Sequence, residues 1–361
     1  MVTETRTDAA GPTEWHIRDE VVHLREWGTS VTHALPLTRE TSIIGAAEGC
    51  WLRLWDPTGR ISRKHAAMTY SGQSGWTLSD LQSKNGVHVD GAHVNSVALI
   101  PGVRIRIGGA VLVAESPKLC ALRELLARFI GWRDENLEEV DQALHSVRVA
   151  ATHRQPLLIC GPGNLVSLAR SLHHHVRGDQ PFVVCGPRSA ATRGVDALAA
   201  AAGGTLCVWR HQQPADFDEV VAALRGSASR VLLVICARAL PRGNDIAAQI
   251  VTVFRSIVVP PLADRAKDLP QIIDAYTNDA ITAYGGWLGP ADREWIAGHA
   301  SDTLAQIEVA TRRIVALHAC GDSVTAAAKL LSISHGSLSD WAMRRALPGR
   351  SPMPAVDEDE E

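Results

Sequence analysis

Short stretches of alternating apolar and polar residues fill the chain between residues 14 and 116. Runs such as VVHLREW, WTLSDL and VRIRIG have the period of two that is typical of half-buried strands, and Gly, Pro, Asn or Asp separates them. A series of many short strands with turn residues between them predicts an all-β domain.

The period changes after Pro117. Apolar residues recur at helical spacing from Leu119 to Phe129, and a second helical pattern runs from Leu137 to Val147 with Asp134 as its expected N-cap. We therefore expect a helical linker at residues 117–152.

A third pattern occupies residues 153–300. Five short runs, PLLIC, PFVVC, GTLCVW, RVLLVIC and SIVV, have continuous rather than alternating apolar residues and are separated by helical stretches. Continuous apolar strands are typical of a parallel sheet with helices on both faces, which predicts an α/β domain. Beyond Pro270 the pattern is helical to about Leu347, and residues 1–13 and 349–361 are expected to be disordered.

Composition excludes several classes of protein. The chain has 361 residues, and 46% hydrophobic against 21% charged residues excludes disorder of the whole chain. Its seven cysteines include no Cys-x-x-Cys pair, so we expect neither a disulfide framework nor a metal site, and we expect no cofactor. The sequence shows no secretion signal or membrane-spanning run, so we expect a cytoplasmic protein that does not enter a membrane.

Polar residues cluster at two places in the β domain. The segment GRISRKHA covers residues 59–66, and LSDLQSKNG covers residues 78–86. Hydroxyl, amide and cationic groups on turns are what phosphate recognition requires. With Ile44-Gly45, Ser62-Arg63-Lys64-His65 and the stretch from Asp80 to Gly86, this region resembles the forkhead-associated (FHA) domain over roughly residues 20–115.

That resemblance implies a β-sandwich that binds phosphothreonine peptides, and therefore a partner that is a substrate of a Ser/Thr kinase. It implies that Ser62 and Arg63 contact the phosphate and that Asn85 contacts the peptide backbone. Arg60 and Lys84 are further candidate cations, whereas Gly45, His65 and Gly86 would be structural. A module whose polar loops only close turns is the alternative.

One residue departs from the FHA pattern. The family usually has arginine directly after the first glycine, and this position is Ala46. Losing a charge-assisted phosphate contact removes about 1.5–3 kcal/mol, or one to two decades of affinity. Arg53, Arg60 and Lys84 are candidates to compensate for the loss.

The α/β region resembles the AAA+ domain of bacterial sigma-54-dependent (NtrC-type) enhancer-binding activators over about residues 140–300. The segments that carry the resemblance are AAGGTLCV at residues 201–208, VPPLADRAKDLP at residues 259–270 and LICG at residues 158–161. A working phosphate-binding loop needs glycines, a lysine and a hydroxyl. Here the loop holds Gly161, Gly163 and Ser167 without the lysine, and the acidic pair after the third strand is absent.

These losses, together with the absence of the GAFTGA loop that grips the sigma factor, predict that the chain is not an enzyme. Residual nucleotide binding without turnover stays open, as does the less favoured alternative of an active ATP-driven activator.

The C-terminal segment predicts a helix-turn-helix at residues 301–348. The pattern gives a long helix, a break at Gly321 with Ser323 as N-cap, a short helix from Val324 to Leu331 and a last helix from His335. Residues 310–352 contain six Lys or Arg against two Asp, so this segment is basic. We expect Ala326, Ala327 and Ala328 at the helix crossing, with a core of Leu330, Ile333, Leu338 and Trp341.

This segment resembles the Fis-type DNA-binding domain that follows the AAA+ domain in the same activators. The resemblance implies His335, Ser337 and Asp340 near base edges and Lys329, Arg344 and Arg345 on phosphates. Useful affinity would require a homodimer. The sequence as a whole thus predicts a signal-responsive transcription regulator that binds a phosphothreonine protein and DNA, and the alternative is an interaction scaffold whose last helices never contact DNA.

Overall fold

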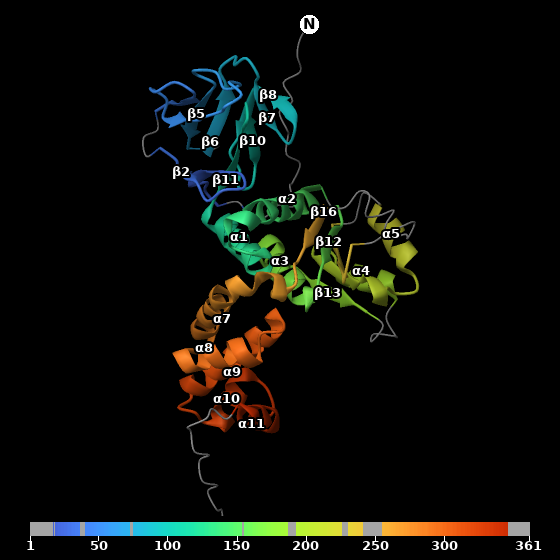
Figure 1. Ribbon diagram of the computed structural model, residues 1–361. Helices are drawn as coiled ribbons and strands as arrows, with labels where there is room; N and C mark the ends of the chain where they lie inside the picture. The colour runs from blue at the N-terminus through green and yellow to red at the C-terminus, as the bar shows by residue number, and fades with distance from the viewer. Residues whose placement is uncertain are drawn as a thin grey trace, which may run out of the picture. The chain divides into compact units, whose positions relative to one another are not determined.

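The computed structural model describes residues 17, 19–36, 40–72, 75–153, 155–186, 193–225, 230–240 and 255–345 (Figure 1). The predicted disordered ends, 1–13 and 349–361, lie outside the described residues. The chain divides into two compact units, Met1–Pro261 and Leu262–Glu361. Each unit is described by itself below.

The first unit begins with the predicted β-sandwich. One sheet has the order β2-β1-β11-β10-β7-β8 and the other the order β4-β3-β5-β6-β9. A single apolar core fills the space between the sheets and includes Leu24, Ile44, Met68, Leu78 and Ile105. The strands are β1 (His23–Glu26), β2 (Thr32–Ala34), β3 (Ser42–Gly45), β4 (Leu52–Arg53), β5 (Ala66–Ser71), β6 (Gly75–Asp80), β7 (Val87–Val89), β8 (Ala92–Val94), β9 (Ser96–Ala98), β10 (Arg104–Ile107) and β11 (Ala110–Glu115).

Two helices follow the sandwich, as the sequence predicted. Helix α1 (Pro117–Ile130) begins at Ser116, whose hydroxyl accepts the N–H of Leu119, and α2 spans Leu137–His153. The prediction that Asp134 caps α2 is wrong, because Asp134 begins a short 3-10 helix (η1, Asp134–Asn136) that leads into α2. A 3-10 turn at a helix start replaces the side-chain cap that the pattern suggested.

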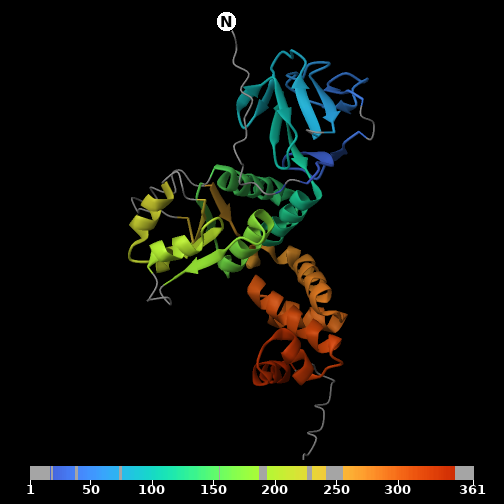
Figure 2. The same cartoon turned by 180° about the vertical axis from the view of Figure 1, so that it is seen from behind.

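The five apolar runs form one parallel sheet with the order β13-β14-β15-β12-β16. Helices α4 (Gly194–Ala200) and α5 (Phe217–Arg225) cover one face of this sheet and share a core with Leu158, Leu206 and Ile235 (Figure 2). Helix α3 (Leu165–Arg177) packs against four of the strands. The strands are β12 (Leu157–Cys160), β13 (Phe182–Cys185), β14 (Thr205–Trp209), β15 (Leu232–Ala237) and β16 (Arg255–Val258). The predicted parallel-sheet α/β region is confirmed.

The second unit is helical. Helices α7 and α8, which the sequence assigned to the end of the α/β region, pack with α9 in this unit. Its helices are η4 (Leu262–Asp268), α7 (Leu269–Tyr284), α8 (Pro290–His299), α9 (Leu304–Ala319), α10 (Val324–Leu331) and α11 (His335–Arg344). No helix among the described residues is both long and apolar enough to cross a membrane.

Candidate functional site

Three loops meet at one end of the sandwich. They connect β3 to β4, β4 to β5 and β6 to β7, and backbone hydrogen bonds join the first two, from Ala46 N–H to Ser62 O at 3.0 Å and from Ala47 N–H to Arg63 O at 3.1 Å. The third loop is held by Ser62 Oγ, which accepts the N–H of Lys84 at 3.1 Å. Because Ser62 accepts in this bond, its hydroxyl proton remains for a ligand oxygen.

His65 lies beneath these loops and fixes their shape. The ring is fully buried, its Nδ1 accepts the N–H of Ser62 at 3.1 Å, and Nε2 donates to Gly86 O at 3.1 Å. Ser83 Oγ lies 2.8 Å from the same Nε2 and donates its own proton to Asp80 at 2.6 Å. The structural role that the sequence implied for His65 thus has a geometric basis, since one ring joins two loops.

Asn85 lies at the surface of the third loop. Its Nδ2 donates to Arg60 O at 2.7 Å, which leaves the side-chain oxygen and the second N–H for a ligand. The side chains of Arg60, Arg63 and Lys84 are exposed. The loops therefore bring together a hydroxyl, a carboxamide and several cations around a rigid backbone.

Two glycines allow the close approach of these loops. A Cβ on Gly45 would lie 2.3 Å from Arg63 O, so only glycine fits between β3 and the second loop. Gly86 has φ +69°, and a Cβ there would lie 2.3 Å from the ring of His93 on β8. Both positions have no room for a side chain.

Ala46, the departure from the FHA pattern, is half-buried and packs on the sandwich core. Arg53 lies opposite Gly45 in the β3–β4 pair, but its guanidinium is 3.5 Å from Glu48. Glu48 competes with any phosphate for that cation. Arg53 thus replaces the missing arginine only at the expense of this exposed ion pair.

Sequence reasoning missed Asp56, which orders the second loop. Its carboxylate accepts the N–H and hydroxyl of Thr58, the N–H of Arg60 at 3.1 Å and the N–H of Gly109 at 3.0 Å. The hydrogen bonds from Thr58 contribute most to lowering the pKa of Asp56. The signal was present, because Asp before Pro-Thr-Gly is typical of a turn that an aspartate side chain closes.

The loop after β12 is the predicted degenerate nucleotide loop. The N–H of Gly161 donates to Ala237 O at 3.0 Å, and a Cβ there would lie 2.3 Å from Val259 O. At the start of α3, Asn164 Oδ1 accepts the N–H of Ser167 at 3.3 Å. Amides that a phosphate would need at Gly161 and Ser167 thus bond within the protein, while Gly163 has φ +89° in the turn between them.

The predicted DNA-contacting residues fall into two groups. His335, Ser337, Asp340, Lys329 and Arg344 are exposed on α10 and α11. Arg345 is not available as predicted, since it is 8% exposed and forms an ion pair with the buried Asp292 of α8. Its guanidinium also lies over the rings of Trp295 and Trp341.

The core of the last three helices differs from the prediction at two positions, one alanine and one leucine. Ala327, Ala328 and Leu338 are buried, and Ile333 and Trp341 pack against them. Ala326 and Leu330 are exposed, and Leu331 packs in place of Leu330. The face of α10 that packs in the core is therefore shifted by one residue toward the C-terminus relative to the predicted face.

Comparison with known proteins gives a consistent result for the sandwich. The sequence model of the FHA domain matches residues 43–108. A structure from an analysis of phosphothreonine-dependent FHA domain interactions is 31% identical over 27% of this chain and 96% of its own, with a TM-score of 0.24. The FhaA FHA domain, complexed with the intracellular domain of another protein, is 32% identical over 25% and 96%, with a TM-score of 0.23.

Mycobacterium tuberculosis EmbR, in complex with a low-affinity phosphopeptide, is 25% identical over 27% of this chain and 24% of its own, with a TM-score of 0.24. A search among curated proteins gave no match. The family match covers all three loops, including the two that hold Ser62, His65 and Asn85. Residues 43–108 of this chain therefore belong to the FHA domain family.

Proposed function

We propose that the sandwich binds a phosphothreonine-containing segment of a partner protein at its three loops. The observation that carries the proposal is that the loop of Ser62 and Arg63 and the loop of Asn85, which are separate in the sequence, are joined by direct hydrogen bonds. In this arrangement the Ser62 hydroxyl and the Arg63 guanidinium receive the phosphate, and Asn85 holds the peptide backbone. A preordered site of this kind loses little conformational entropy when a peptide binds.

Fluorescence anisotropy with a phosphothreonine peptide library tests this proposal on the full chain. Ser62→Ala is expected to weaken binding by about ten-fold or more, since it removes a hydrogen bond to a charged group. Ser79→Ala is the matched control, because Ser79 bonds to Ser96 on the sheet and not to the loops. Equal affinities of the Ser62→Ala and Ser79→Ala variants would contradict the assignment.

We further propose that the C-terminal helices bind DNA and that the chain regulates transcription in response to the phosphorylated partner. Helices α10 and α11 are joined by a three-residue turn, Ser334 caps α11 through the N–H of Ser337, and the first turn of α11 is exposed. In a helix-turn-helix this turn meets base edges, while Lys329 and Arg344 meet phosphates. Docking of the partner would change how these helices assemble on DNA as a dimer.

Anisotropy against genomic fragments at increasing salt tests the DNA step. Arg344→Ala is expected to weaken binding and to reduce its salt dependence, because one phosphate contact is lost. Arg293→Ala is the control, since Arg293 on α8 forms an ion pair with Asp274. A chain that binds no fragment at low salt would favour the scaffold alternative.

The middle region is proposed to act without hydrolysing ATP. The amides of Gly161 and Ser167 already bond to Ala237 and Asn164, and Leu165 occupies the region where the loop would need a lysine. Phosphate release from ATP and magnesium should equal that of a Ser167→Ala variant. Turnover well above that variant would overturn this part of the proposal.

A further inference from the structure

A row of basic side chains crosses the outer face of the larger sandwich sheet. Arg106 on β10 pairs with His88 on β7, and His88 pairs with His93 on β8. The residues that alternate with them, such as Val87 and Ile107, point into the core, so the three basic side chains point outward. His93 and Arg106 are exposed, and His88 is half-buried between them.

The row begins at the loop that carries Asn85. The ring of His93 lies against Gly86, where a Cβ would be only 2.3 Å from the ring. The rings of His88 and His93 are in edge contact, with centroids 5.6 Å apart. The row is thus continuous with the proposed phosphopeptide site and crosses three strands, a span of about 10 Å.

The electrostatic surroundings of His88 are basic. Burial, followed by Arg106 and His93, lowers its pKa, and His65 acts in the same direction, while a hydrogen bond with the Gly86 backbone opposes them. These groups come from β10, β8, the end of the second loop and the third loop. Like charges crowded together in this way disfavour a cation and favour an anion.

We propose that His88, His93 and Arg106 form a second anion-binding site, which takes an acidic side chain or a second phosphate of the same phosphothreonine partner. This inference rests on the proposed function of the loops and deepens it. Because His93 lies against Gly86, next to Asn85, one extended peptide segment that leaves the loops over this sheet can reach the row. The partner is then a phosphothreonine segment followed or preceded by negative charge.

The test measures affinities of the full chain for matched fluorescent peptides. One peptide carries a single phosphothreonine among neutral residues, and the others add glutamates, or a second phosphothreonine, on either side. We expect the best acidic peptide to bind about three- to ten-fold tighter than the neutral one, from a few partly exposed charge pairs. The glutamate and phosphate arms distinguish which acidic group the row prefers.

Two variants test whether His88, His93 and Arg106 cause the gain in affinity for acidic peptides. His88→Gln/His93→Gln and Arg106→Gln should each reduce the gain while leaving the affinity for the neutral phosphopeptide within about two-fold. His33→Gln is the control, because His33 lies on β2 at the opposite edge of the same sheet and contacts Glu26. The gain should also grow as the pH falls below about 6.5, because the pKa of His88 is lowered in the free protein and a bound anion favours its protonated form.

The outcomes separate the two proposals. If the neutral phosphopeptide binds but acidic peptides bind no tighter, or the gain survives in both row variants, the second site is overturned and the proposed function stands. If no phosphopeptide binds, both fall. Binding of zinc ions by the wild type, lost in the histidine variant and without an anion-dependent gain, would assign the row to a metal ion and overturn the inference.

Discussion

Arg25 of β1 donates to Asp141 of α2 at 2.8 Å, and both side chains are buried. Arg25 also donates to Glu115 at 2.8 Å, and Asp141 accepts the N–H of Gly28 at 2.7 Å. Burial disfavours the charge on Arg25, but its hydrogen bond with Asp141 and the charges of Glu115 and Asp141 outweigh burial and raise its pKa. The pair therefore joins the sandwich to the following helix through fully satisfied charges.

Asp141→Ala is expected to destabilise the first unit by about 3–5 kcal/mol, because Arg25 loses a buried partner. Urea unfolding of the full chain, with hydrogen exchange to locate the change in α2, measures this effect. Glu48→Ala removes an exposed ion pair with Arg53 and should change stability by about 0.5 kcal/mol or less. Comparable losses in the two variants would show that the buried pair contributes no more than a surface one.

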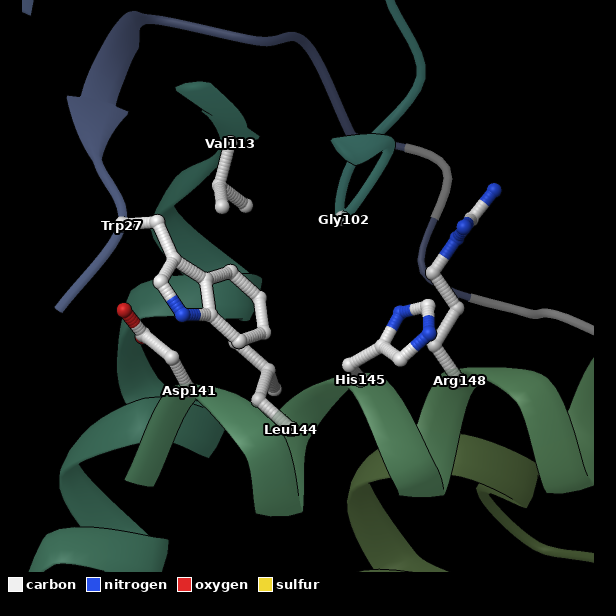
Figure 3. A pocket seen from close by; sticks show the side chains of 7 residues that line it. All are labelled: Trp27, Gly102, Val113, Asp141, Leu144, His145 and Arg148. Carbon is white, nitrogen blue, oxygen red and sulfur yellow. The ribbon is translucent and has the colours of Figure 1, made fainter. Parts of the chain in front are cut away.

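His145 makes the same junction sensitive to acid. Together with Trp27, Leu144 and Arg148 it lines a small pocket between α2 and the sandwich, with about 10 Å³ of space, enough for one water molecule (Figure 3). Burial, with help from Arg104 and Arg148, lowers the pKa of His145 to about 4. Its Nδ1 is buried and has no hydrogen-bond partner in the part of the chain that the structure describes.

Because the folded pKa lies below the ordinary value of 6.5, the unfolded chain binds the proton first as the pH falls. The stability that neutral His145 contributes is complete above about pH 6.5 and is lost between there and about pH 4, by about 2 kcal/mol at pH 5. In a His145→Gln variant this loss should disappear. Unfolding at about pH 7 and pH 5 checks it, and parallel pH curves for the two proteins would refute it.

Gly45→Ala is expected to lower stability by about 1–3 kcal/mol and to weaken phosphopeptide binding, since the new Cβ would displace the backbone of Arg63. Gly49→Ala is the control, because no atom lies within 4 Å of a Cβ there. Thermal melting and peptide titration of both variants measure the difference. A Gly45→Ala protein that behaves like Gly49→Ala would mean that the loops can separate at little cost.

Ala46→Arg should tighten phosphopeptide binding by about one to two decades, because it restores a charge-assisted contact. Ala47→Arg adds the same charge one residue further along and is expected to give a smaller gain. The comparison is made at two salt concentrations, since a general attraction decays with salt while a direct contact persists. Equal gains from both variants would show that position 46 does not face the phosphate.

Arg345→Ala should destabilise the helical unit by about 3 kcal/mol, since it leaves the buried Asp292 without this partner. Arg344→Ala should leave stability unchanged, because Arg344 is exposed and donates only to Asp340 O at 3.1 Å. Thermal unfolding separates the two neighbours. Equal stability of both variants would show that the ion pair between Arg345 and Asp292 does not stabilise the helical unit.

Prediction from the sequence was most accurate for elements whose boundaries are marked by a few neighbouring residues. The N-cap at Ser323 and the expected start at His335 defined α10 and α11 as they occur, because a turn or capping residue and the apolar spacing that follows it lie within a few residues. Strand β8 has a weaker signal, although Asp90 and Gly91, both with positive φ, form the hairpin turn before it. Three residues are too short a run for a periodic pattern to be recognised.

Apart from the cap expected at Asp134, the errors concern contacts between segments that are separate in the sequence. Arg345 looked like a surface cation because its partner, Asp292, lies 53 residues earlier in the chain. Leu330 and Leu331 are adjacent, so apolar periodicity alone cannot decide which of them faces the core. The row of His88, His93 and Arg106 depends on strand register, which the sequence shows only once the pairing is known.

The contact between Arg25 and Asp141 has a practical consequence for anyone who wishes to excise the sandwich. A fragment that ends at residue 116 keeps Glu115 but loses α2. The Arg25 guanidinium and the Gly28 N–H then lose Asp141 and become more exposed to water. A fragment that extends to His153 and so includes α2, Leu137–His153, would keep the partners of Arg25 on β1.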